Sequence, residues 1–454
     1  MRDLGHIQAV YLIGIGGIGM SALARYFAVQ GKAVAGYDRT QTELTKELES
    51  SGINIHYSDS TVEISDTFKN PENTLVIYTP AVKALNELAY FQANKFEVLK
   101  RSEVLGALSR SYNTVAVAGT HGKTTTSSIV AHLLKSSSQD CNAFLGGISS
   151  NYNTNLLTST SSNLMVVEAD EFDRSFLTLT PNIAIVTSVD ADHLDIYGSA
   201  DEMLKSFHDF TNCISENGTL IYRAGLPFSD TSRKSFTYSL QEKSDYHASN
   251  LSVVDGKYTF SMHAPTRTIS DLTFGMPGMH NLENAVAAFA AVDQLGLSDA
   301  EIRNGFASYK GVKRRFDVHI NTDKLVYIDD YAHHPTEISA CVNSVRELFP
   351  GRKVKGIFQP HLFSRTKDHM TEFASSLSEL DEVTLLDIYP AREEPMPGIT
   401  SSVLLSQINA PSKELVSKTA AVEDISIDNV DVLLTMGAGD IDQLVAPIKH
   451  KLGL

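Results

Sequence analysis

The stretch AVAGTHGKTTTSSIV, residues 116–130, has the pattern of an apolar strand, a glycine-containing loop and the start of a helix. It is typical of a phosphate-binding loop, whose general pattern is G-x-x-x-x-G-K-[ST]. Gly122, Lys123 and Thr124 fit this pattern, but Val117 stands where the first glycine should be. Such a lysine can neutralise phosphate oxygens, the threonine hydroxyl can bind Mg²⁺, and loop N–H groups can hold the anion. The sequence therefore predicts a variant phosphate-binding loop.

Two apolar strands that follow this loop end in acidic residues. The first ends at Glu168, inside the run EADEFD (168–173), and the second leads to DADHLD (190–195), which contains His193. Open parallel sheets bind ligands beyond the carboxyl ends of their strands, and carboxylate oxygens suit Mg²⁺. We therefore predict that Thr124 and Glu168 lie at magnesium, with His193 at a second magnesium position. For the other acidic residues of the run, plain surface charge is the alternative.

A second glycine-rich loop lies near the beginning of the chain. Gly14, Gly16 and Gly19 form G-x-G-x-x-G between an apolar strand at 9–13 and a helical pattern. Glycines let the backbone approach a diphosphate, and the helix N-terminus adds partial positive charge. Asp38 closes the next strand and can accept a hydrogen bond from a ribose hydroxyl. Both NAD and a UDP-sugar fit this pattern.

Strands alternate with helices in three segments, which predicts an α/β protein with doubly wound parallel sheets. We expect three domains: an N-terminal Rossmann-like domain at 1–105, a central P-loop-type ATPase domain at 106–313, and a C-terminal Rossmann-like domain at 314–454. Short alternating strands between 217 and 274 predict a small β-rich excursion within the central domain.

The composition narrows the classes of function. The chain has 454 residues and a formal net charge of −16, which argues against a nucleic-acid partner and against binding to an anionic membrane. Its three cysteines are far apart and have no metal or disulfide spacing. No basic-then-apolar leader and no apolar run of about 20 residues occurs. We expect a cytoplasmic protein.

Six motifs occur in order along nearly the whole chain, and together they resemble the Mur ligase family. The family shares the shortened G-T-x-G-K-T-T loop, which explains Val117. The motifs are GTHGKTTT (119–126), EADEFDRSF (168–176), DADHLDIYG (190–198), GMHNLENAVAA (278–288), KRRF (313–316) and DDYAHHPTE (329–337).

The resemblance implies an ATP-dependent ligase of peptidoglycan precursor synthesis. Its expected substrates are ATP, L-alanine and UDP-N-acetylmuramate, with two Mg²⁺ ions. The family's reaction passes through an acyl phosphate and releases ADP and phosphate. We expect no nucleic-acid or membrane partner, and a monomer or a homodimer.

The resemblance also implies roles at matching positions. The catalytic residues are Lys123, Glu168, His193 and Arg315. The ATP-binding residues are Gly119, Thr120, His121, Gly122, Lys123, Thr124, Thr125, His280, Asn281, Asn284, Arg315 and Asp329. The UDP-sugar residues are Gly14, Gly16, Gly17, Ile18, Gly19, Met20, Ser21, Asp38, His56, Thr79, Pro80 and Ala81. The amino-acid residues are Tyr331, His333, His361 and Arg365, and the metal ligands are Thr124, Glu168 and His193.

Two positions depart from the pattern of some relatives. Where several members carry a carbamylated lysine, this chain has His208, with Lys205 out of register, so we expect no carbamylation. Leu362 stands where some relatives have a second arginine for the amino-acid carboxylate. Three alternatives stay open: a recycling ligase that adds a ready-made peptide, an NAD-dependent oxidoreductase, and a non-catalytic UDP-sugar or ATP sensor.

Overall fold

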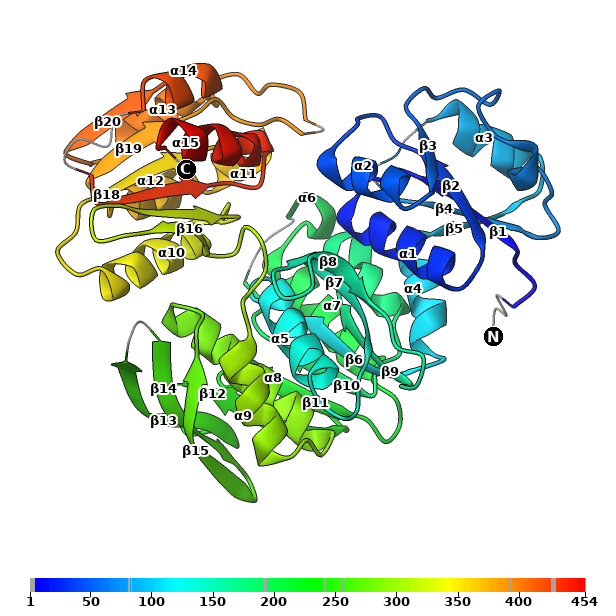
Figure 1. Ribbon diagram of the computed structural model, residues 1–454, viewed down its shortest axis with the longest axis horizontal. Coiled ribbons are helices and arrows are strands. Elements are labelled where there is room, and N and C mark those ends of the chain that lie inside the picture. Colours follow the sequence, from blue (N-terminus) through cyan, green and yellow to red (C-terminus); the bar gives the residue numbers. More distant parts are fainter. Residues whose placement is uncertain are drawn as a thin grey trace. The chain divides into compact units, whose positions relative to one another are not determined.

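The computed structural model describes residues 5–80, 82, 84–190, 194–240, 242–254, 257–391, 393–425 and 430–453. The chain divides into two compact units. The first comprises Met1–Ser252, Thr259–Phe274 and Glu283–Lys310, and the second comprises Val253–Tyr258, Gly275–Leu282 and Gly311–Leu454. The first β-sheet and almost all of the second belong to the first unit, and the third sheet belongs to the second unit (Figure 1).

The first sheet has five strands in the order β3-β2-β1-β4-β5, and all neighbours are parallel. Because the order reverses between β1 and β4, the strand ends there form a crevice in which open sheets bind ligands. The strands are β1 (Ala9–Ile13), β2 (Ala33–Tyr37), β3 (Asn54–His56), β4 (Thr74–Tyr78) and β5 (Glu97–Lys100). The helices are α1 (Ile18–Val29), α2 (Glu43–Ser50), α3 (Asn86–Ala93) and α4 (Arg101–Ser109), with a 3₁₀ turn at Asp66–Phe68.

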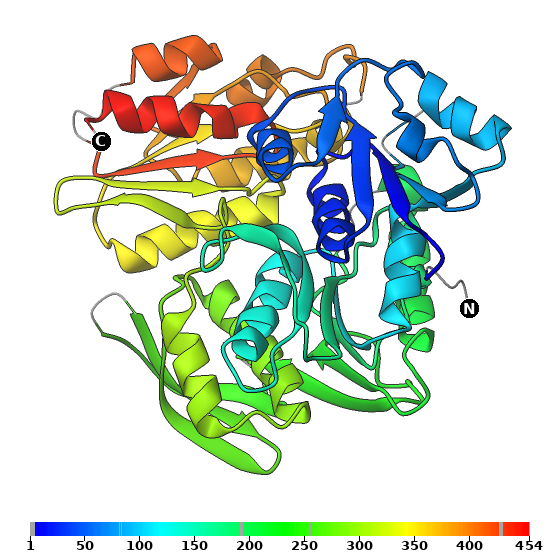
Figure 2. The same ribbon diagram turned by 45° about the vertical axis from the view of Figure 1, so that its right-hand side comes forward.

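Both faces of this sheet are buried, which explains the continuous apolar strands in its sequence. On β1, Val10 and Leu12 face a core that includes residues of α1 and α4. Tyr11 and Ile13, on the opposite face, pack with residues of α3. Figure 2 shows α1 and α3 on opposite sides of the blue strands. The first core continues into the second sheet, so the first two sheets share one hydrophobic core.

The second sheet has ten strands in the order β15-β14-β13-β12-β11-β10-β6-β9-β7-β8. The predicted β-rich stretch is present, and its strands β11 to β15 extend the same sheet. The strands are β6 (Asn113–Ala118), β7 (Asn142–Ser149), β8 (Thr154–Leu157), β9 (Leu164–Glu168), β10 (Ile183–Val186), β11 (Thr219–Arg223), β12 (Lys234–Ser239), β13 (Tyr246–Val254), β14 (Lys257–Ala264) and β15 (Arg267–Phe274). The helices are α5 (Lys123–Lys135), α6 (Leu194–Tyr197), α7 (Ala200–Asn212), α8 (Met279–Gln294) and α9 (Asp299–Ser308), with the 3₁₀ segment η2 (Phe172–Thr178).

The third sheet is parallel except for its edge strand β16, and its order is β16-β17-β21-β18-β19-β20. The sequence pattern in this part of the chain predicts one helix at 335–348 and another near 365–380. The first is confirmed as α10, whereas the second region forms two helices, α11 and α12. The strands are β16 (Asp317–Asn321), β17 (Val326–Asp330), β18 (Val354–Phe358), β19 (Glu382–Leu385), β20 (Ser412–Leu415) and β21 (Val432–Met436). The helices are α10 (Pro335–Leu348), α11 (Phe363–Asp368), α12 (Met370–Leu377), α13 (Ser401–Gln407), α14 (Lys418–Glu423) and α15 (Val445–Lys451), with a 3₁₀ segment at Asp440–Leu444.

The α/β architecture predicted from the sequence is confirmed. The predicted limit between residues 105 and 106 falls inside α4, and the one between 313 and 314 falls between α9 and β16. The domain limits themselves stay a prediction. Among the helices of the described residues, none is both long enough and apolar enough to cross a bilayer.

α4 packs closely against η2 at Gly106, so a substitution of Gly106 tests this packing. A Cβ at Gly106 would lie 2.4 Å from the backbone oxygen of Thr178, so one backbone must shift. Helix propensity alone favours alanine over glycine by about 1 kcal/mol. We expect Gly106→Ala instead to destabilise the protein by about 1–3 kcal/mol, because the added methyl overpacks the contact. Thermal unfolding measures this, with Ser50→Ala on the exposed side of α2 as the control, and a raised midpoint for Gly106→Ala would contradict the packing.

Candidate active site

The phosphate-binding loop joins β6 to α5, and its two glycines have backbone conformations that suit glycine. Gly119 has φ 132° and Gly122 has φ 81°. A Cβ at Gly119 would lie 2.0 Å from Thr187 Oγ1, so this glycine also allows close approach to the end of β10. The loop is tied to that strand end, because His121 N donates to Ser188 Oγ at 2.8 Å. The strand, loop and helix thus have the order that the sequence predicted.

Lys123, the first residue of α5, is held on the inner side of this loop. Its Nζ donates to the carbonyl oxygens of Gly119 (2.6 Å) and Thr120 (3.2 Å), and it lies 2.8 Å from Glu171 Oε2. Burial lowers the pKa of Lys123, but the neighbouring carboxylates, Glu171 first, outweigh it and the pKa is raised. Burial raises the pKa of Glu171 to about 7, against the opposing effect of Lys123. The lysine therefore stays charged.

Thr124 and Glu168, two of the three predicted metal ligands, lie side by side. Thr124 Oγ1 donates to Glu168 Oε2 at 2.7 Å. A Cβ at Gly146, on β7, would lie 2.1 Å from the same carboxylate oxygen, so this glycine makes room for Glu168. His193 lies outside the described residues. Within those residues, no group of three or more His, Cys, Asp and Glu is arranged to hold a metal ion.

Each acidic residue of the run at 168–173 contacts a partner. From the sequence alone, three of these residues could have been plain surface charges. Glu171 is buried, and Tyr197 donates to its backbone oxygen at 2.6 Å. Its role beside Lys123 was missed, since the sequence does not say which carboxylate of a run faces which cation. The four contacts join Glu168 to Thr124 (2.7 Å), Asp170 to Arg101 (3.2 Å), Glu171 to Lys123 (2.8 Å) and Asp173 to Lys100 (2.9 Å).

Asn284, on α8, lies against the phosphate-binding loop. A Cβ at Gly122 would lie 2.5 Å from Asn284 Oδ1, so the glycine and the asparagine are direct neighbours. The helix begins at Met279, and Asn281 is therefore in its first turn rather than at its N-cap. Asn281 Nδ2 donates to the Pro277 carbonyl at 2.6 Å, and His280 is exposed.

The first glycine-rich loop is shaped by contacts at three of its predicted residues. Gly16 N donates to Asp38 Oδ2 at 2.7 Å, so Asp38 holds the loop against the end of β2. Gly14 has φ 84°, and a Cβ there would lie 2.7 Å from Thr79 Cγ2. Ser21 is buried and accepts from Asn155 Nδ2 at 2.9 Å, which links α1 to β8. The remaining predicted residues here are Gly17, the N-cap of α1, then Ile18, Gly19 and Met20 in α1, and Pro80 after β4. Ala81 lies outside the described residues.

His56, at the end of β3, belongs to a partly buried network. Its Nε2 lies 2.7 Å from the Tyr11 hydroxyl and 3.2 Å from Glu87 Oε1. The Tyr11 hydroxyl donates to Glu87 Oε2 at 2.7 Å. Burial lowers the pKa of His56 and raises the pKa of the fully buried Glu87 to about 7. Tyr11 and Glu87, which the sequence did not single out, therefore fix the orientation of His56.

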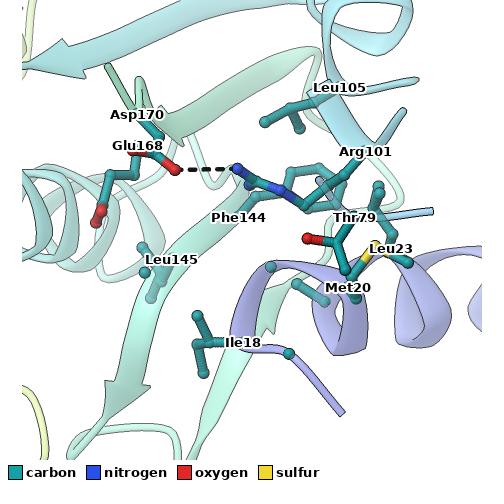
Figure 3. Close-up of a pocket in the computed structure, with 14 residues that line it drawn as sticks. Ile18, Met20, Leu23, Thr79, Arg101, Leu105, Phe144, Leu145, Glu168 and Asp170 are labelled. Atoms are coloured by element: carbon teal, nitrogen blue, oxygen red, sulfur yellow. Dashed lines mark hydrogen bonds and ion pairs between the residues drawn. The ribbon is translucent and has the colours of Figure 1, made fainter. Parts of the chain in front are cut away.

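A cavity of about 240 Å³ lies between the first glycine-rich loop and the second sheet, within the first unit (Figure 3). Gly17, Ile18 and Gly19 line one part, and Glu168 and Asp170 line another. The cavity thus brings predicted UDP-sugar residues and a predicted metal ligand to one space. Arg101 lies between them and pairs with Asp170.

In the second unit, the predicted residues Arg315, Asp329 and Tyr331 belong to a connected group in and near β17. Asp329 is fully buried, accepts from Thr435 Oγ1 at 2.6 Å, and pairs with Arg314 Nε at 3.0 Å. The guanidinium of Arg315 lies over the Tyr331 ring, 4.9 Å from its centroid. The sequence pointed to Arg315, and the structure adds its neighbour Arg314 as the partner of Asp329.

The predicted amino-acid residues also lie together. The ring of His333 is 5.2 Å from that of Tyr331 and 6.2 Å from that of His361. Arg365 Nη1 lies 3.4 Å from His361 Nδ1, and only 7% of Arg365 is exposed. Leu362, the departure noted in the sequence, precedes α11 with φ 71° and is buried.

Family models match all three parts of the chain. The Mur ligase family catalytic domain matches residues 9–113, the Mur ligase middle domain matches 117–292, and the Mur ligase glutamate ligase domain matches 314–439. The chain belongs to the Mur ligase family. The resemblance inferred from the six motifs is therefore confirmed.

Curated Mur ligases resemble this one over its full length. A UDP-N-acetylmuramate–L-alanine ligase of Parabacteroides distasonis is 50% identical over 454 residues, covering 99% of this chain and 98% of that protein. One of Christiangramia forsetii is 50% identical and covers 100% and 99%. Among solved structures, a UDP-N-acetylmuramate–alanine ligase of Thermotoga maritima has a TM-score of 0.83 and 27% identity, covering 98% of this chain and 99% of that one. A murein peptide ligase of Psychrobacter arcticus, with a TM-score of 0.74 and 22% identity over 98% and 99%, shares the fold.

Glu87 makes the stability of this Mur ligase depend on pH. Burial raises its folded-state pKa to about 7, above the ordinary value of 4.5 for a glutamate, so the folded state favours the protonated acid. That contribution is present below about pH 4.5 and is lost as the pH rises through 7. Relative to Glu87→Gln, the wild type should therefore lose up to about 3 kcal/mol of unfolding free energy between pH 5 and 8.

Thermal unfolding across this range measures the difference between the two proteins, and the exposed Glu72→Gln is the control. A difference that is constant with pH would show that Glu87 ionises as an ordinary carboxyl in the folded state.

Proposed function

We propose that this Mur ligase joins L-alanine to the carboxylate of UDP-N-acetylmuramate, consumes ATP, and releases ADP and phosphate in peptidoglycan precursor synthesis. The observation that carries the proposal is the identity of about 50%, from end to end, with curated ligases of that name. The solved ligase of Thermotoga maritima supports it with the same fold over 98% of the chain. We expect the reaction to take place in the cytoplasm. The oligomeric state stays a prediction.

The loop Gly119–Thr125 fits the triphosphate of ATP. Its glycines let the loop lie close to the end of β10 and to Asn284, because a Cβ at either glycine would collide with a neighbouring side chain. Lys123 supplies a buried cation, and Thr124 supplies a hydroxyl beside Glu168. Asn284 adjoins the loop, which supports its assignment, with His280 and Asn281 of the same helix, to the nucleotide. Arg315 and Asp329 are proposed as further ATP residues.

Magnesium fits the oxygen donors of Thr124 and Glu168, because Mg²⁺ prefers hard oxygen ligands. His193 is proposed as the further ligand, and two ions as the number bound. When bound, Mg²⁺ neutralises phosphate charge and stabilises the charge that develops as the phosphoryl group is transferred. The chain's own residues hold and orient the reactants around it.

The first step joins two anions, and this is its main physical difficulty. A carboxylate oxygen of the sugar acid attacks the γ-phosphorus, the bond to the bridging oxygen breaks, and ADP leaves. The product is an acyl phosphate, whose carbonyl carbon is a much better electrophile than that of a carboxylate. Lys123 lowers the repulsion between the two anions and stabilises the charge on the phosphoryl oxygens.

In the second step the amine of L-alanine attacks the acyl carbon. The new C–N bond forms, the C–O bond to phosphate breaks, and the nitrogen loses a proton. We assign the alanine to Tyr331, His333, His361 and Arg365. Arg365 suits the alanine carboxylate because its planar fork of donors matches a carboxylate, and its burial beside His361 strengthens that pairing.

The UDP portion is assigned to the first glycine-rich loop. The loop N–H groups at the start of α1 suit the diphosphate, and Asp38 suits the ribose. His56 is proposed as an additional contact, oriented by Tyr11 and Glu87. We keep the prediction that no lysine is carbamylated: Lys205 is exposed, and His208 packs on Phe228 at 5.0 Å between ring centroids.

An assay of phosphate release with UDP-N-acetylmuramate and ATP tests the function. Each reaction receives one acceptor: L-alanine, glycine, L-serine, or the tripeptide that begins L-Ala-γ-D-Glu. We expect L-alanine to support turnover best. Activity with the tripeptide and none with L-alanine would favour the recycling ligase instead, and NADH binding without UDP-sugar binding would favour the oxidoreductase.

Lys123 should matter for turnover far more than for affinity. Lys123→Ala should lower kcat by at least about 100-fold, because the charge it provides acts mainly on the transferring phosphoryl group. The dissociation constant for UDP-N-acetylmuramate should change by less than about threefold, since Lys123 is assigned to ATP. Lys135→Ala, which removes a paired lysine from the other end of α5, is the control. Near-normal turnover of Lys123→Ala would refute this role.

A further inference from the structure

Arg101 is a cation in the cavity of Figure 3 to which the sequence gave no role. It begins α4, and its side chain, 21% exposed, lines the cavity together with Gly19 and Glu168. Its Nη2 lies 3.2 Å from Asp170 Oδ2, the contact drawn as a dashed line in Figure 3. The guanidinium therefore already binds a carboxylate inside this cavity.

Gly19 is shaped for this arginine. A Cβ at Gly19 would lie 2.7 Å from Arg101 Nη1 and 3.0 Å from Arg101 Cδ. Any larger residue would push the guanidinium away from the start of α1. The third glycine of G-x-G-x-x-G, which sequence reasoning gives to the nucleotide, thus also makes room for Arg101 in this chain.

The residues that line the two parts of the cavity indicate which kind of anion Arg101 could bind. Gly17 and Ile18, where N–H groups at the start of α1 favour a diphosphate, line one part. Glu168, bonded to Thr124 of the ATP loop, lines the other. If the diphosphate of a sugar acid occupies the first part, the rest of the cavity is left for the sugar and its carboxylate. Arg101 lies between these parts and has the fork of donors that matches a carboxylate.

We propose that Arg101 binds the carboxylate of the UDP-sugar acid and positions it for attack, and that Asp170 holds Arg101 until this carboxylate replaces it. The proposal rests on the proposed function for the identity of the sugar acid. The exchange costs little, because Asp170 is 36% exposed and ion pairs in contact with solvent contribute little to stability. Asp170 also has a second partner, since its Oδ1 accepts from Phe172 N at 3.1 Å. Arg101 therefore selects sugar acids over neutral UDP-sugars.

Calorimetric titration of the full chain without ATP tests this. The ligands are UDP-N-acetylmuramate and UDP-N-acetylglucosamine, which share the nucleotide, the diphosphate and the sugar ring but differ in the lactyl ether that carries the carboxylate. Arg101→Gln should weaken binding of the acid by about 10- to 100-fold, as expected for a lost hydrogen-bonded charge, and binding of the neutral sugar by less than about threefold. Arg101→Lys should lie between, because it keeps the charge and loses the fork.

Arg25→Gln is the matched control. Arg25 is also 21% exposed and also pairs with a carboxylate, Glu47, but it does not line the cavity. It should leave both affinities unchanged, and thermal midpoints should show that every variant is folded. Asp170→Asn should tighten binding of the acid, because the competing carboxylate is gone.

The possible results distinguish failure of the proposed function from failure of the role inferred for Arg101. Wild-type protein that fails to bind UDP-N-acetylmuramate would overturn the proposed function itself. Wild-type binding with equal losses for both ligands in Arg101→Gln would assign Arg101 to the diphosphate and overturn the inference alone. Unchanged affinity of folded Arg101→Gln for the acid, or weaker binding by Asp170→Asn, would also overturn it.

Discussion

The site is organised by the acidic run that follows β9, in which each carboxylate has its own partner. Glu171 illustrates the constraint, because a buried carboxylate is costly unless a cation or donors compensate it. Lys123 provides that compensation, and the pairing fixes the lysine at the start of α5. The other three members of the run contact Thr124, Arg101 and Lys100. One short segment therefore joins α5, the phosphate-binding loop and α4 around the end of a single strand.

These pairs position groups more than they stabilise the fold. Desolvation of a buried ion pair offsets most of its Coulombic gain, so the Lys123–Glu171 pair is weak evidence for stability. Its effect is to hold a charged ammonium beside the loop that we propose for ATP. The same holds for Arg101, whose partner Asp170 is itself partly exposed. The cations are thus held in place in advance by carboxylates, and little reorganisation is needed when anionic substrates arrive.

The sequence predicted the elements and the ends of the sheets at which chemistry occurs, because both follow from local patterns. The loop at Gly119–Thr125, the strand ending in Glu168 and the helix at 335–348 needed only periodicity and glycine spacing. The sequence could not predict partners across the fold. That Glu171 rather than Asp170 faces Lys123, that Tyr11 and Glu87 hold His56, and that Arg314 pairs with Asp329 depend on packing between distant segments. A run of several acidic residues does not by itself show which carboxylate pairs with which cation.

The net charge of −16 makes this local pairing more important for function. Every proposed substrate except L-alanine is anionic, so the long-range field of the protein does not attract them. At physiological ionic strength that field is screened beyond about 8 Å, and short-range contacts decide binding. Lys123 and Arg101 are the cations that we propose for these contacts, and each lies within 3.2 Å of a carboxylate of the acidic run. Glu171 and Asp170 hold these two cations in position, and we propose that this is how an acidic protein brings two anions together.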